Sequence, residues 1–561
     1  MFDPIEKAKK RLAQRQDQPA PLLLPALWGG DNPPPMTLAT GDVAVPPTTG
    51  SVSGVSVFGD QLLLGHSVYR RGNSWWVGDS DDAITASPRS HLITVAPSGS
   101  AKGTALAIPN LLNWRGSAVV TDPKGEMAWT TARYRRDVLG QEVYILDPWA
   151  VVWRNYWAKW EARAPGRYAC DETVRTAVCN PLAGLDPLDP EFDRVARDIA
   201  VGLCVEKPND HNPFFARSGQ GYLYRMIRAV CGGFAGHEEN GRFMPMPASL
   251  RSVRRLIEQG RDGVKRVIER CATQDPRLAT QLGTYLSNVD SVQDTIRTAE
   301  VSTDFLEDRV LEMFLEPEAG ERAFDLAALG DPERHITVYL VLPTDMFSVM
   351  GGFLRVMLQR ALRESMRNPR EEKTLFMLDE LGSIGRIDNL AEAYALGRGA
   401  GICCWGFWQD ISQIKDDYGQ RYATFEANSE VLQFHRCFDL ETSKHMAERI
   451  GRHERLQVSS TSSTTSSQQG GSSSSTTSRQ WQTEAAFDAA ELEQISQVLI
   501  GNFMKERAGS MYWGAPMDYF ATPFFNGKFR PVPDKPFLGV APWRPEMTVA
   551  QFAAWRERNL K

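Results

Sequence analysis

The chain has 561 residues, of which 42% are hydrophobic and 24% charged, and its net charge is −6. This ordinary composition allows two to four domains with a large core, and it excludes a strongly basic protein that binds nucleic acid through its overall charge. The eight cysteines form no C-x-x-C pair, which is typical of buried thiols in a cytosolic protein. The longest apolar stretch, 337–358, contains Pro343 and Asp345, so we expect no transmembrane segment.

The first 90 residues precede the regular part of the chain. Residues 1–50 combine a short basic segment with proline clusters, and they are predicted to form an N-terminal arm and linker. Short strands are expected at 61–64 and 74–77. The first part of an α/β domain is therefore placed at 51–185.

A strand followed by a small-residue loop and a helix is predicted at 91–111, HLITVAPSGSAKGTALAIPNL. This order is typical of a phosphate-binding P-loop, in which backbone N–H groups surround the phosphates and a lysine reaches them. Lys102 is the candidate lysine, and the alternative is an ordinary turn with a solvated lysine. The expected nucleotide-binding residues are Pro97, Ser98, Gly99, Ser100, Ala101, Lys102, Gly103 and Thr104.

The loop departs from the common pattern G-x-x-x-x-G-K-[ST] at three positions. Ala96 and Ala101 replace both glycines, and Gly103 stands where a Mg²⁺-binding hydroxyl is usual. The hydroxyl would then come from Thr104 or Ser100. Because alanine resists positive φ, the replaced glycines bear on the rate of hydrolysis.

Strand and helix patterns alternate after the loop. Strands at 117–121 and 143–146 each end in Asp-Pro, which predicts a parallel sheet with ligands at the carboxyl ends of its strands. Only helices are expected within 186–330, at 192–204, 219–234, 248–259, 262–272 and 278–305. Strands return at 336–342, 375–378, 402–408 and 431–434, with a helix at 347–366. We therefore predict an inserted all-α domain rather than a separate C-terminal one. Its basic runs at 251–255 and 265–270 are either a DNA-facing surface or solvated helix faces.

Two carboxylates end the apolar strand at 374–378. We assign Asp379 to Mg²⁺ and Glu380 to activation of the attacking water, the two acidic roles that a P-loop NTPase requires. The alternative is an acidic pair that caps the next helix. Gln409, which follows the strand at 402–408, is expected to sense the γ-phosphate or to orient the water. Arg398 is the candidate arginine finger from a neighbouring subunit or else a solvated loop residue, and Arg386 is a weaker candidate.

The last part of the nucleotide-binding domain is placed at 331–561. Residues 459–478 are almost entirely Ser, Thr, Gln and Gly, and they are predicted to form a disordered surface loop. An acidic helix is expected at 485–498, followed by aromatic-rich strands and turns.

The chain resembles the coupling-protein ATPases of type IV secretion and bacterial conjugation (TraG/TraD-like), which are related to the FtsK/HerA motors. The matching stretches include APSGSAKGTALAIPNLL, TDPKGE, VYILDPW, CNPLAGLDP, LFMLDELGSIGRIDNL and GRGAGICCWGFWQDISQIKDDYG, and they run in family order over about residues 90–455. The resemblance implies a RecA-like P-loop domain with an inserted all-α domain that recognises substrate. It also implies ATP and Mg²⁺ as cofactors, hexameric rings, and delivery of relaxase–DNA complexes or protein effectors to a secretion channel.

The same resemblance places Lys102, Asp379 and Glu380 on the family's Walker positions, Gln409 on its sensor glutamine and Arg398 on the arginine of the related motors. Family members commonly carry N-terminal transmembrane helices, whereas none is predicted here. We therefore expect a cytoplasmic protein, with three alternatives: it works from the cytoplasm, a membrane partner recruits it to the inner face of the bacterial inner membrane, or it belongs to a soluble branch of the family. The alternatives to a coupling motor are a nucleotide-gated adaptor that hydrolyses ATP weakly or not at all, and a HerA-like DNA translocase.

Overall fold

The computed structural model describes thirteen stretches of the chain. These are residues 61–71, 74–77, 83–87, 91–100, 102–157, 177–206, 213–316, 321–437, 439–465, 472–485, 487–496, 500–505 and 510–515. The predicted N-terminal arm, most of the tail and Ala101 lie outside the described residues.

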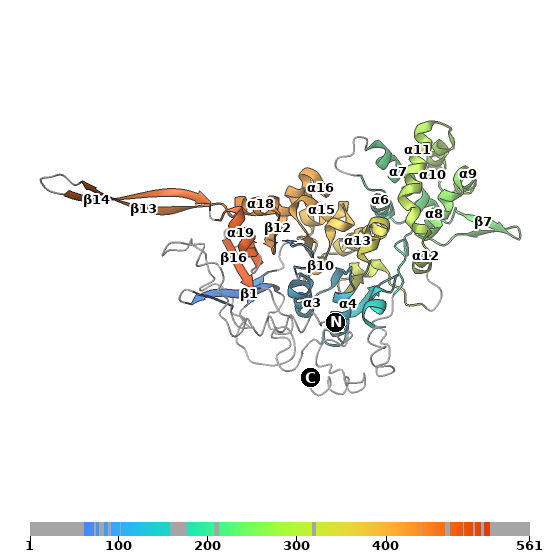
Figure 1. Cartoon of the computed structure of the whole chain (residues 1–561). Helices are drawn as coiled ribbons and strands as arrows, with labels where there is room; N and C mark the ends of the chain where they lie inside the picture. Colours follow the sequence, from blue (N-terminus) through green and yellow to red (C-terminus); the bar gives the residue numbers. More distant parts are fainter. Residues whose placement is uncertain are drawn as a thin grey trace, which may run out of the picture.

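A parallel sheet forms the centre of the molecule (Figure 1). Its strand order is β12 (Ser429–Phe434), β4 (His91–Val95), β11 (Ile402–Trp408), β10 (Thr374–Leu378), β5 (Ala118–Thr121), β9 (Ile336–Leu340) and β6 (Glu142–Leu146). Every neighbouring pair in this order is parallel. Apolar runs without alternation are typical of strands that are buried on both faces. The predicted α/β class is confirmed.

Alternate residues of these strands pack into two separate cores, one on each face of the sheet. In β10, Phe376 and Leu378 belong to one core, whereas Leu375 and Met377 belong to the other. Side chains of a strand point to opposite faces in turn, so a continuous apolar run fills both cores. α13 (Phe347–Arg367) packs in the first core, and α3 (Ile108–Asn113) and α4 (Glu126–Asp137) pack in the second.

An antiparallel group of strands extends the sheet beyond β12. The order continues through β15 (Ile500–Met504), β16 (Ser510–Ala515) and β1 (Leu62–Arg71), and β1 also pairs with β2 (Ser74–Val77) and β3 (Ala83–Ala86). Strands from both ends of the described chain therefore meet in one sheet. Sequence patterns predicted several of these strands but not their shared place at this edge.

The chain between β6 and β9 forms a helical region, although these two strands are neighbours in the sheet. Figure 1 shows this region, with α7 to α11, to one side of the sheet. Its main helices are α6 (Phe192–Leu203), α7 (Phe214–Cys231), α8 (Leu250–Glu258), α9 (Gly260–Cys271), α10 (Pro276–Gly283), α11 (Asp290–Thr303) and α12 (Arg309–Leu315). The prediction of an inserted helical domain is confirmed, although a hairpin of β7 (Gly236–Glu239) and β8 (Arg242–Pro245) interrupts it. Within the described residues, we find no helix with both the length and the apolar character needed to cross a bilayer.

The prediction of a single helix at 278–305 is wrong, because the chain forms two helices there, α10 and α11, with a break between them. Asp275 caps α10 by accepting a hydrogen bond from Leu278 N, and Ser287 takes an extended conformation with ψ of 154°. An apolar period can continue across such a break, so periodicity alone did not reveal it.

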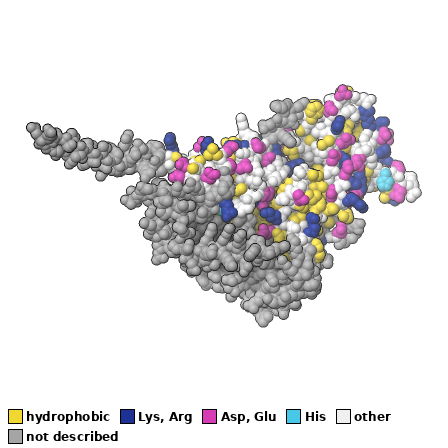
Figure 2. Space-filling view, viewed as in Figure 1, with side chains coloured by type: hydrophobic (Ala, Val, Ile, Leu, Met, Phe, Trp, Pro, Cys, Tyr) yellow, Lys and Arg dark blue, Asp and Glu magenta, His cyan; other side chains and the backbone are white. Residues whose placement is uncertain are grey.

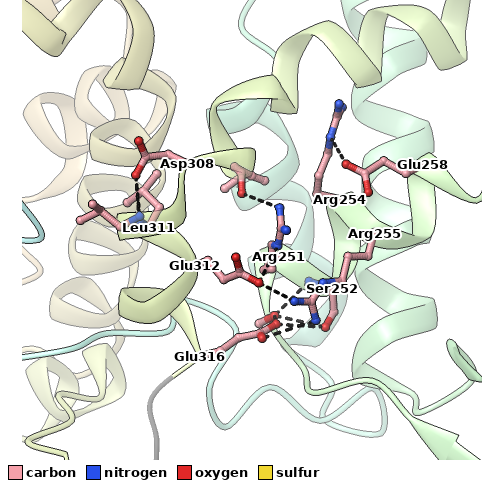
Figure 3. Close-up of polar contacts among 12 residues, drawn as sticks. Arg251, Ser252, Arg254, Arg255, Glu258, Asp308, Leu311, Glu312 and Glu316 are labelled. Carbon is pink, nitrogen blue, oxygen red and sulfur yellow. Dashed lines mark hydrogen bonds and ion pairs between the residues drawn. The ribbon is translucent and has the colours of Figure 1, made fainter.

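The arginines of α8 pair with acidic residues inside the helical region (Figure 3). Arg254 lies within ion-pair distance of Glu258 and Glu307, and Arg255 contacts Glu312 at 2.6 Å. Figure 2 shows acidic and basic side chains mixed over this region rather than a basic patch. The run at 251–255 is therefore largely neutralised within the chain, and this speaks against its predicted alternative as a DNA-facing surface.

The Ser/Thr-rich segment forms a long hairpin instead of the disordered loop predicted at 459–478. β13 (Arg452–Thr465) pairs antiparallel with β14 (Ser472–Ala485) in a register that runs from Arg452↔Ala485 to Thr465↔Ser472. In Figure 1 this ribbon projects away from the body of the protein. Composition argued for disorder because the segment lacks apolar residues, but β-branched threonines and a regular antiparallel ladder suit a strand.

Candidate active site at the carboxyl edge of the sheet

Three adjacent strands end at one place on the sheet. β11 lies between β4 and β10, with Trp408 paired to Val95 and Leu378 paired to Gly406. The residues that follow the three strands therefore meet at the same edge. This juxtaposition brings together Lys102, Asp379, Glu380 and Gln409, four of the residues that the sequence singled out.

Lys102 contacts both predicted carboxylates. Its Nζ lies 2.9 Å from Glu380 Oε1 and 3.2 Å from Asp379 Oδ1, and Lys102 is 8% exposed. Burial lowers the pKa of Lys102, but attraction to Asp379 and Glu380 outweighs it, so the pKa is raised overall. The side chain is a buried ammonium at the point where the helical segment Gly103–Ala107 begins.

The two carboxylates differ in their electrostatics. Burial raises the pKa of Asp379 more than Lys102 lowers it. The pKa of Glu380 is lowered, because Lys102 and a 2.8 Å hydrogen bond from Gln409 Nε2 outweigh burial. Glu380 is therefore the more strongly ionised of the two carboxylates. Its second partner, after Lys102, is Gln409, which the sequence analysis assigned to the same site.

The backbone around Glu380 is unusual for a non-glycine residue. Glu380 has φ of +57°, in the left-handed region. Such conformations are costly and gather at functional sites, where surrounding contacts hold them. Here Thr121 Oγ1 donates a 2.9 Å hydrogen bond to Asp379 O and thereby fixes the peptide that precedes Glu380.

The loop after β4 makes a tight turn that is hydrogen-bonded to the end of β11. Ala96 N donates to Trp408 O at 2.8 Å, Ser100 N donates to Pro97 O at 3.2 Å, and Gly99 has φ of +81°. Ser100 Oγ is buried and makes no hydrogen bond to any described atom. A buried hydroxyl without a partner, next to a buried ammonium and two carboxylates, fits a bound phosphate with Mg²⁺.

Other members of the predicted loop lie where the sequence placed them. Pro97, Ser98 and Gly99 form the turn, and Gly103 and Thr104 lie in the first helical turn. A Cβ built at Gly103 would meet no atom within 4 Å. Ala101 lies outside the described residues, so its predicted role stays a prediction.

Sequence reasoning missed two residues that flank this loop. Arg436 Nη1 donates a 3.0 Å hydrogen bond to Gly99 O, and His435 N donates to Val95 O at 3.0 Å. Arg436 has φ of +54°, a second strained position at this edge. The signal that was available is that both residues directly follow a buried strand, β12, whose pairing with β4 the sequence did not reveal.

The motif TDPKGE also lies close to Asp379, although no role was predicted for it from the sequence. Asp122 follows β5 and accepts a 2.7 Å hydrogen bond from Ala128 N, and burial raises its pKa to about 7. Burial and the charge of Asp379 also raise the pKa of Glu126, which the charge of Lys124 opposes. The signal available in the sequence was Asp122 itself, an acidic residue at the end of β5, which is the strand next to β10.

The two predicted arginines lie away from this cluster. Arg398 is exposed in the turn before β11, at the opposite edge of the sheet. It is close to His91 at the start of β4, whose pKa is lowered by burial first and then by the charges of Lys373 and Arg398. Arg386 pairs with Asp388 at 2.5 Å. Neither arginine contacts Lys102 or the carboxylates in this chain.

Two family models match the chain. One describes the "Type IV secretory system Conjugative DNA transfer" family and covers residues 50–159. The other describes the "TraM recognition site of TraD and TraG" and covers residues 373–497. Together they contain the P-loop, the TDPKGE motif, the two carboxylates and Gln409.

Curated relatives carry names from the same family. The conjugal transfer protein TraG of Rhizobium radiobacter is 26% identical over 381 residues, which are 64% of this chain and 52% of that protein. The type IV secretion system-coupling protein VirD4 of Bartonella henselae is 24% identical over 383 residues, 64% of this chain and 53% of that protein. The chain thus spans about half the length of the curated relatives that it matches.

Solved structures of the conjugative coupling protein TrwB share the fold. The complex of TrwB with ADP and Mg²⁺ gives a TM-score of 0.54 at 17% identity and covers 82% of this chain and 94% of that one. An unbound form of TrwB gives a TM-score of 0.55 at 16% identity, over 78% and 88% of the two chains. In its motifs, its family-model matches and its relatives, the chain is similar to the coupling proteins of type IV secretion and bacterial conjugation, and its fold is similar to that of TrwB.

Proposed function

We propose that the chain binds and hydrolyses ATP with Mg²⁺ at the edge where β4, β10 and β11 end. The observation that carries this proposal is the contact of Lys102 with Asp379 and Glu380, together with the hydrogen bond from Gln409 to Glu380. A lysine after a small-residue loop, two acids and a polar amide on adjacent strand ends are the parts that P-loop hydrolysis requires.

Each side chain has a defined role in this proposal. Lys102 exchanges its carboxylate partners for the β- and γ-phosphates, and the backbone N–H groups of the loop bind the phosphate oxygens. Asp379, with the hydroxyl of Ser100 or Thr104, holds Mg²⁺, which when bound offsets the negative charge of the phosphates. Glu380 stays ionised, which suits it to accept a proton from the attacking water.

Gln409 links the acid to the loop side of the site. Its amide donates to Glu380 Oε2, while the other oxygen of the same carboxylate contacts Lys102. An amide that binds either the water or the γ-phosphate changes its partner when phosphate is released. Gln409 is therefore the residue through which nucleotide state reaches the rest of the domain.

We further propose that copies of the chain form a ring, with six subunits as in the predicted family arrangement. Lys102 and Arg398 lie at opposite edges of the same sheet. A guanidinium in this position can reach a nucleotide only on a neighbouring subunit. Transition-state charge would then be stabilised across the interface, and hydrolysis would depend on assembly.

The substrate proposal rests on the family. Relatives are named for conjugal transfer and for coupling to type IV secretion, and one family model is a TraM recognition site. We propose that the chain recruits DNA, a relaxase–DNA complex or a protein effector to such a channel. The helical region between β6 and β9 is the proposed recognition surface. Its mixed charges favour a specific contact with a protein over sequence-independent binding to DNA.

A nucleotide-gated adaptor with weak hydrolysis is the second candidate function. Ala96 at the first glycine position of the loop and the neutralised arginines of α8 favour it. A HerA-like DNA translocase is a third candidate, and DNA-stimulated hydrolysis that needs no secretion partner would favour it.

Steady-state ATP hydrolysis by the purified chain, with and without single- and double-stranded DNA, tests the proposal. We expect Lys102→Ala and Glu380→Gln to abolish turnover. The matched controls, Lys265→Ala and Glu371→Gln, change exposed residues and should leave it intact. Tight ATP binding without turnover under every condition would overturn the motor and support the adaptor.

A further inference from the structure

A second glutamine lies directly behind the proposed site. Gln413 is on α16 (Ile411–Tyr418), whose N-cap Asp410 accepts a 2.9 Å hydrogen bond from Gln413 N. The side chain of Gln413 turns back toward the strand ends, and its Oε1 accepts a 2.9 Å hydrogen bond from Gln409 N. One glutamine therefore holds the backbone of the other.

This contact is not an ordinary helix cap. In a capping box, the residue three positions after the N-cap accepts a hydrogen bond from the backbone N–H of the N-cap itself. Gln413 is at that third position, but its acceptor binds the N–H of Gln409, one residue earlier. The bond thus fixes the residue whose side chain reaches Glu380, rather than the N-terminus of the helix.

The Gln413 amide also lies against Gly382, in the chain that follows the carboxylates. A Cβ added to Gly382 would come within 2.2 Å of Gln413 Oε1 and 2.3 Å of its Cδ. Real Cβ atoms do not approach so closely, so any larger residue at 382 must displace this amide. Gly382 is two residues after Glu380, and the Gln413 amide therefore lies between the ends of β10 and β11.

We propose that Gln413 is a positioning residue for ATP hydrolysis, held by Gly382, that keeps Gln409 in hydrogen-bond reach of Glu380. The inference rests on the proposed ATPase function. Without an acceptor at Gln413, the N–H of Gln409 loses its partner, and the loop between β11 and α16 is free to shift. Catalytic geometry is sensitive to such shifts, whereas binding of the nucleotide through Lys102 and the loop is not.

Three variants separate this role from simple packing. Gln413→Met keeps the length of the side chain and removes the acceptor, Gln413→Glu keeps an acceptor oxygen, and Gly382→Ala pushes the amide away. We expect Gln413→Met and Gly382→Ala each to lower kcat by about tenfold or more, with KM for ATP within about twofold of the parent value. Gln413→Glu should retain most of kcat. The exposed Gln420 supplies the matched control, Gln420→Met.

The double variant makes the test specific. Because both changes break the same contact, Gly382→Ala with Gln413→Met should be no slower than either single variant. Multiplicative losses, equal losses for Gln413→Glu and Gln413→Met, or losses that follow the fraction of unfolded protein would each overturn the positioning role. Parent-like kcat in Gln413→Met would overturn it directly.

Hydrogen exchange supplies a readout that does not need hydrolysis. The amide of Gln409 should exchange about tenfold or more faster in Gln413→Met and Gly382→Ala, and at the parent rate in Gln413→Glu. Unchanged exchange would overturn the inference even if the parent protein hydrolyses ATP. If the parent protein hydrolyses nothing, the proposed function fails, and exchange still decides whether Gln413 holds Gln409.

Discussion

Lys102 Nζ lies 2.9 Å from Glu380 Oε1, although 278 residues separate the two side chains along the sequence. Asp379 contacts the same ammonium, so a single buried lysine balances two carboxylates. The contact joins the loop after β4 to the end of β10. The charge of Lys102 also lowers the pKa of both carboxylates, which burial raises. Loss of the lysine should therefore change stability as well as nucleotide binding.

Lys102→Met is expected to destabilise the chain by about 3–5 kcal/mol near pH 8, because it removes the cation that both buried carboxylates contact. In the parent protein the pKa of Glu380 is lowered, so its contribution is present above the unfolded pKa and is lost as pH falls through the folded pKa. In the variant the charge of Lys102 no longer offsets burial, and only the hydrogen bond from Gln409 and the charge of Lys124 still lower the pKa of Glu380. The pKa of Glu380 therefore rises, and the stability lost relative to the parent protein should be larger at pH 8 than at pH 5. Urea unfolding at pH 5 and pH 8 measures the difference.

Glu380→Gln combined with Lys102→Met is the control for that result. Removing one orphaned charge should recover a large part of the stability lost at pH 8. A deficit that is the same at both pH values, and that Glu380→Gln does not reduce, would mean that Lys102 contributes through packing and not through charge.

Arg254→Ala is expected to destabilise the helical region by about 1–3 kcal/mol. Arg254 is 7% exposed and donates to Glu300 O and Thr303 Oγ1 as well as to acidic side chains, so its removal breaks several partly buried hydrogen bonds at once. Denaturant unfolding measures the loss, and the exposed Arg266→Ala should change stability by less than about 0.5 kcal/mol.

DNA binding by the Arg254→Ala variant distinguishes a structural role of Arg254 from a direct contact with DNA. Affinity for DNA, measured at a salt concentration where the variant is folded, should be unchanged in Arg254→Ala. A drop in affinity together with a smaller salt dependence would instead make α8 a phosphate-binding surface.

Much of the site could be predicted from the sequence because its parts are local. Lys102 follows a strand and a small-residue loop, and Asp379 and Glu380 end a strand of five buried residues. Such patterns need no knowledge of tertiary contacts. The order of the strands is a different matter: the placement of β11 between β4 and β10, which brings Gln409 to Glu380, depends on pairings between distant segments.

What the sequence did not reveal depends on contacts across the fold. Arg436 reaches Gly99 only because β12 pairs with β4, and the contact of Gln413 with Gly382 exists only because β10 and β11 are neighbours. The ribbon of β13 and β14 was missed for another reason. Its composition lacks the apolar residues from which packing is usually inferred, but pairing of its two strands needs only the backbone.

The contribution of Asp122 to the stability of the chain should fall as pH rises from about 4 to about 7. Burial raises the pKa of Asp122 to about 7, so the native state binds more protons than the unfolded state over this range. Asp122→Asn keeps an acceptor for Ala128 N and removes the charge. Its stability relative to the parent should therefore increase with pH and level off above pH 7, by about 1.4 kcal/mol for each unit of pKa shift.

Thermal or urea unfolding from pH 4.5 to pH 8 measures this effect. Asp345→Asn, at an exposed position, is the control and should run parallel to the parent protein at every pH. A variant at position 122 whose difference from the parent does not change with pH would show that Asp122 is ionised in the native state throughout the range.

Arg398→Ala should abolish most hydrolysis while it leaves ATP binding unchanged, because Arg398 lies at the edge of the sheet opposite Lys102. If Arg398 acts on a neighbouring subunit, mixing Arg398→Ala with Glu380→Gln should restore activity that neither variant has alone. In some interfaces of the mixed ring, an intact Glu380 then faces an intact Arg398. Arg421→Ala, at an exposed arginine elsewhere, serves as the control for loss of charge. Parent-like turnover by Arg398→Ala, or a mixture that stays inactive although both variants assemble with each other, would exclude this arginine as the residue supplied in trans.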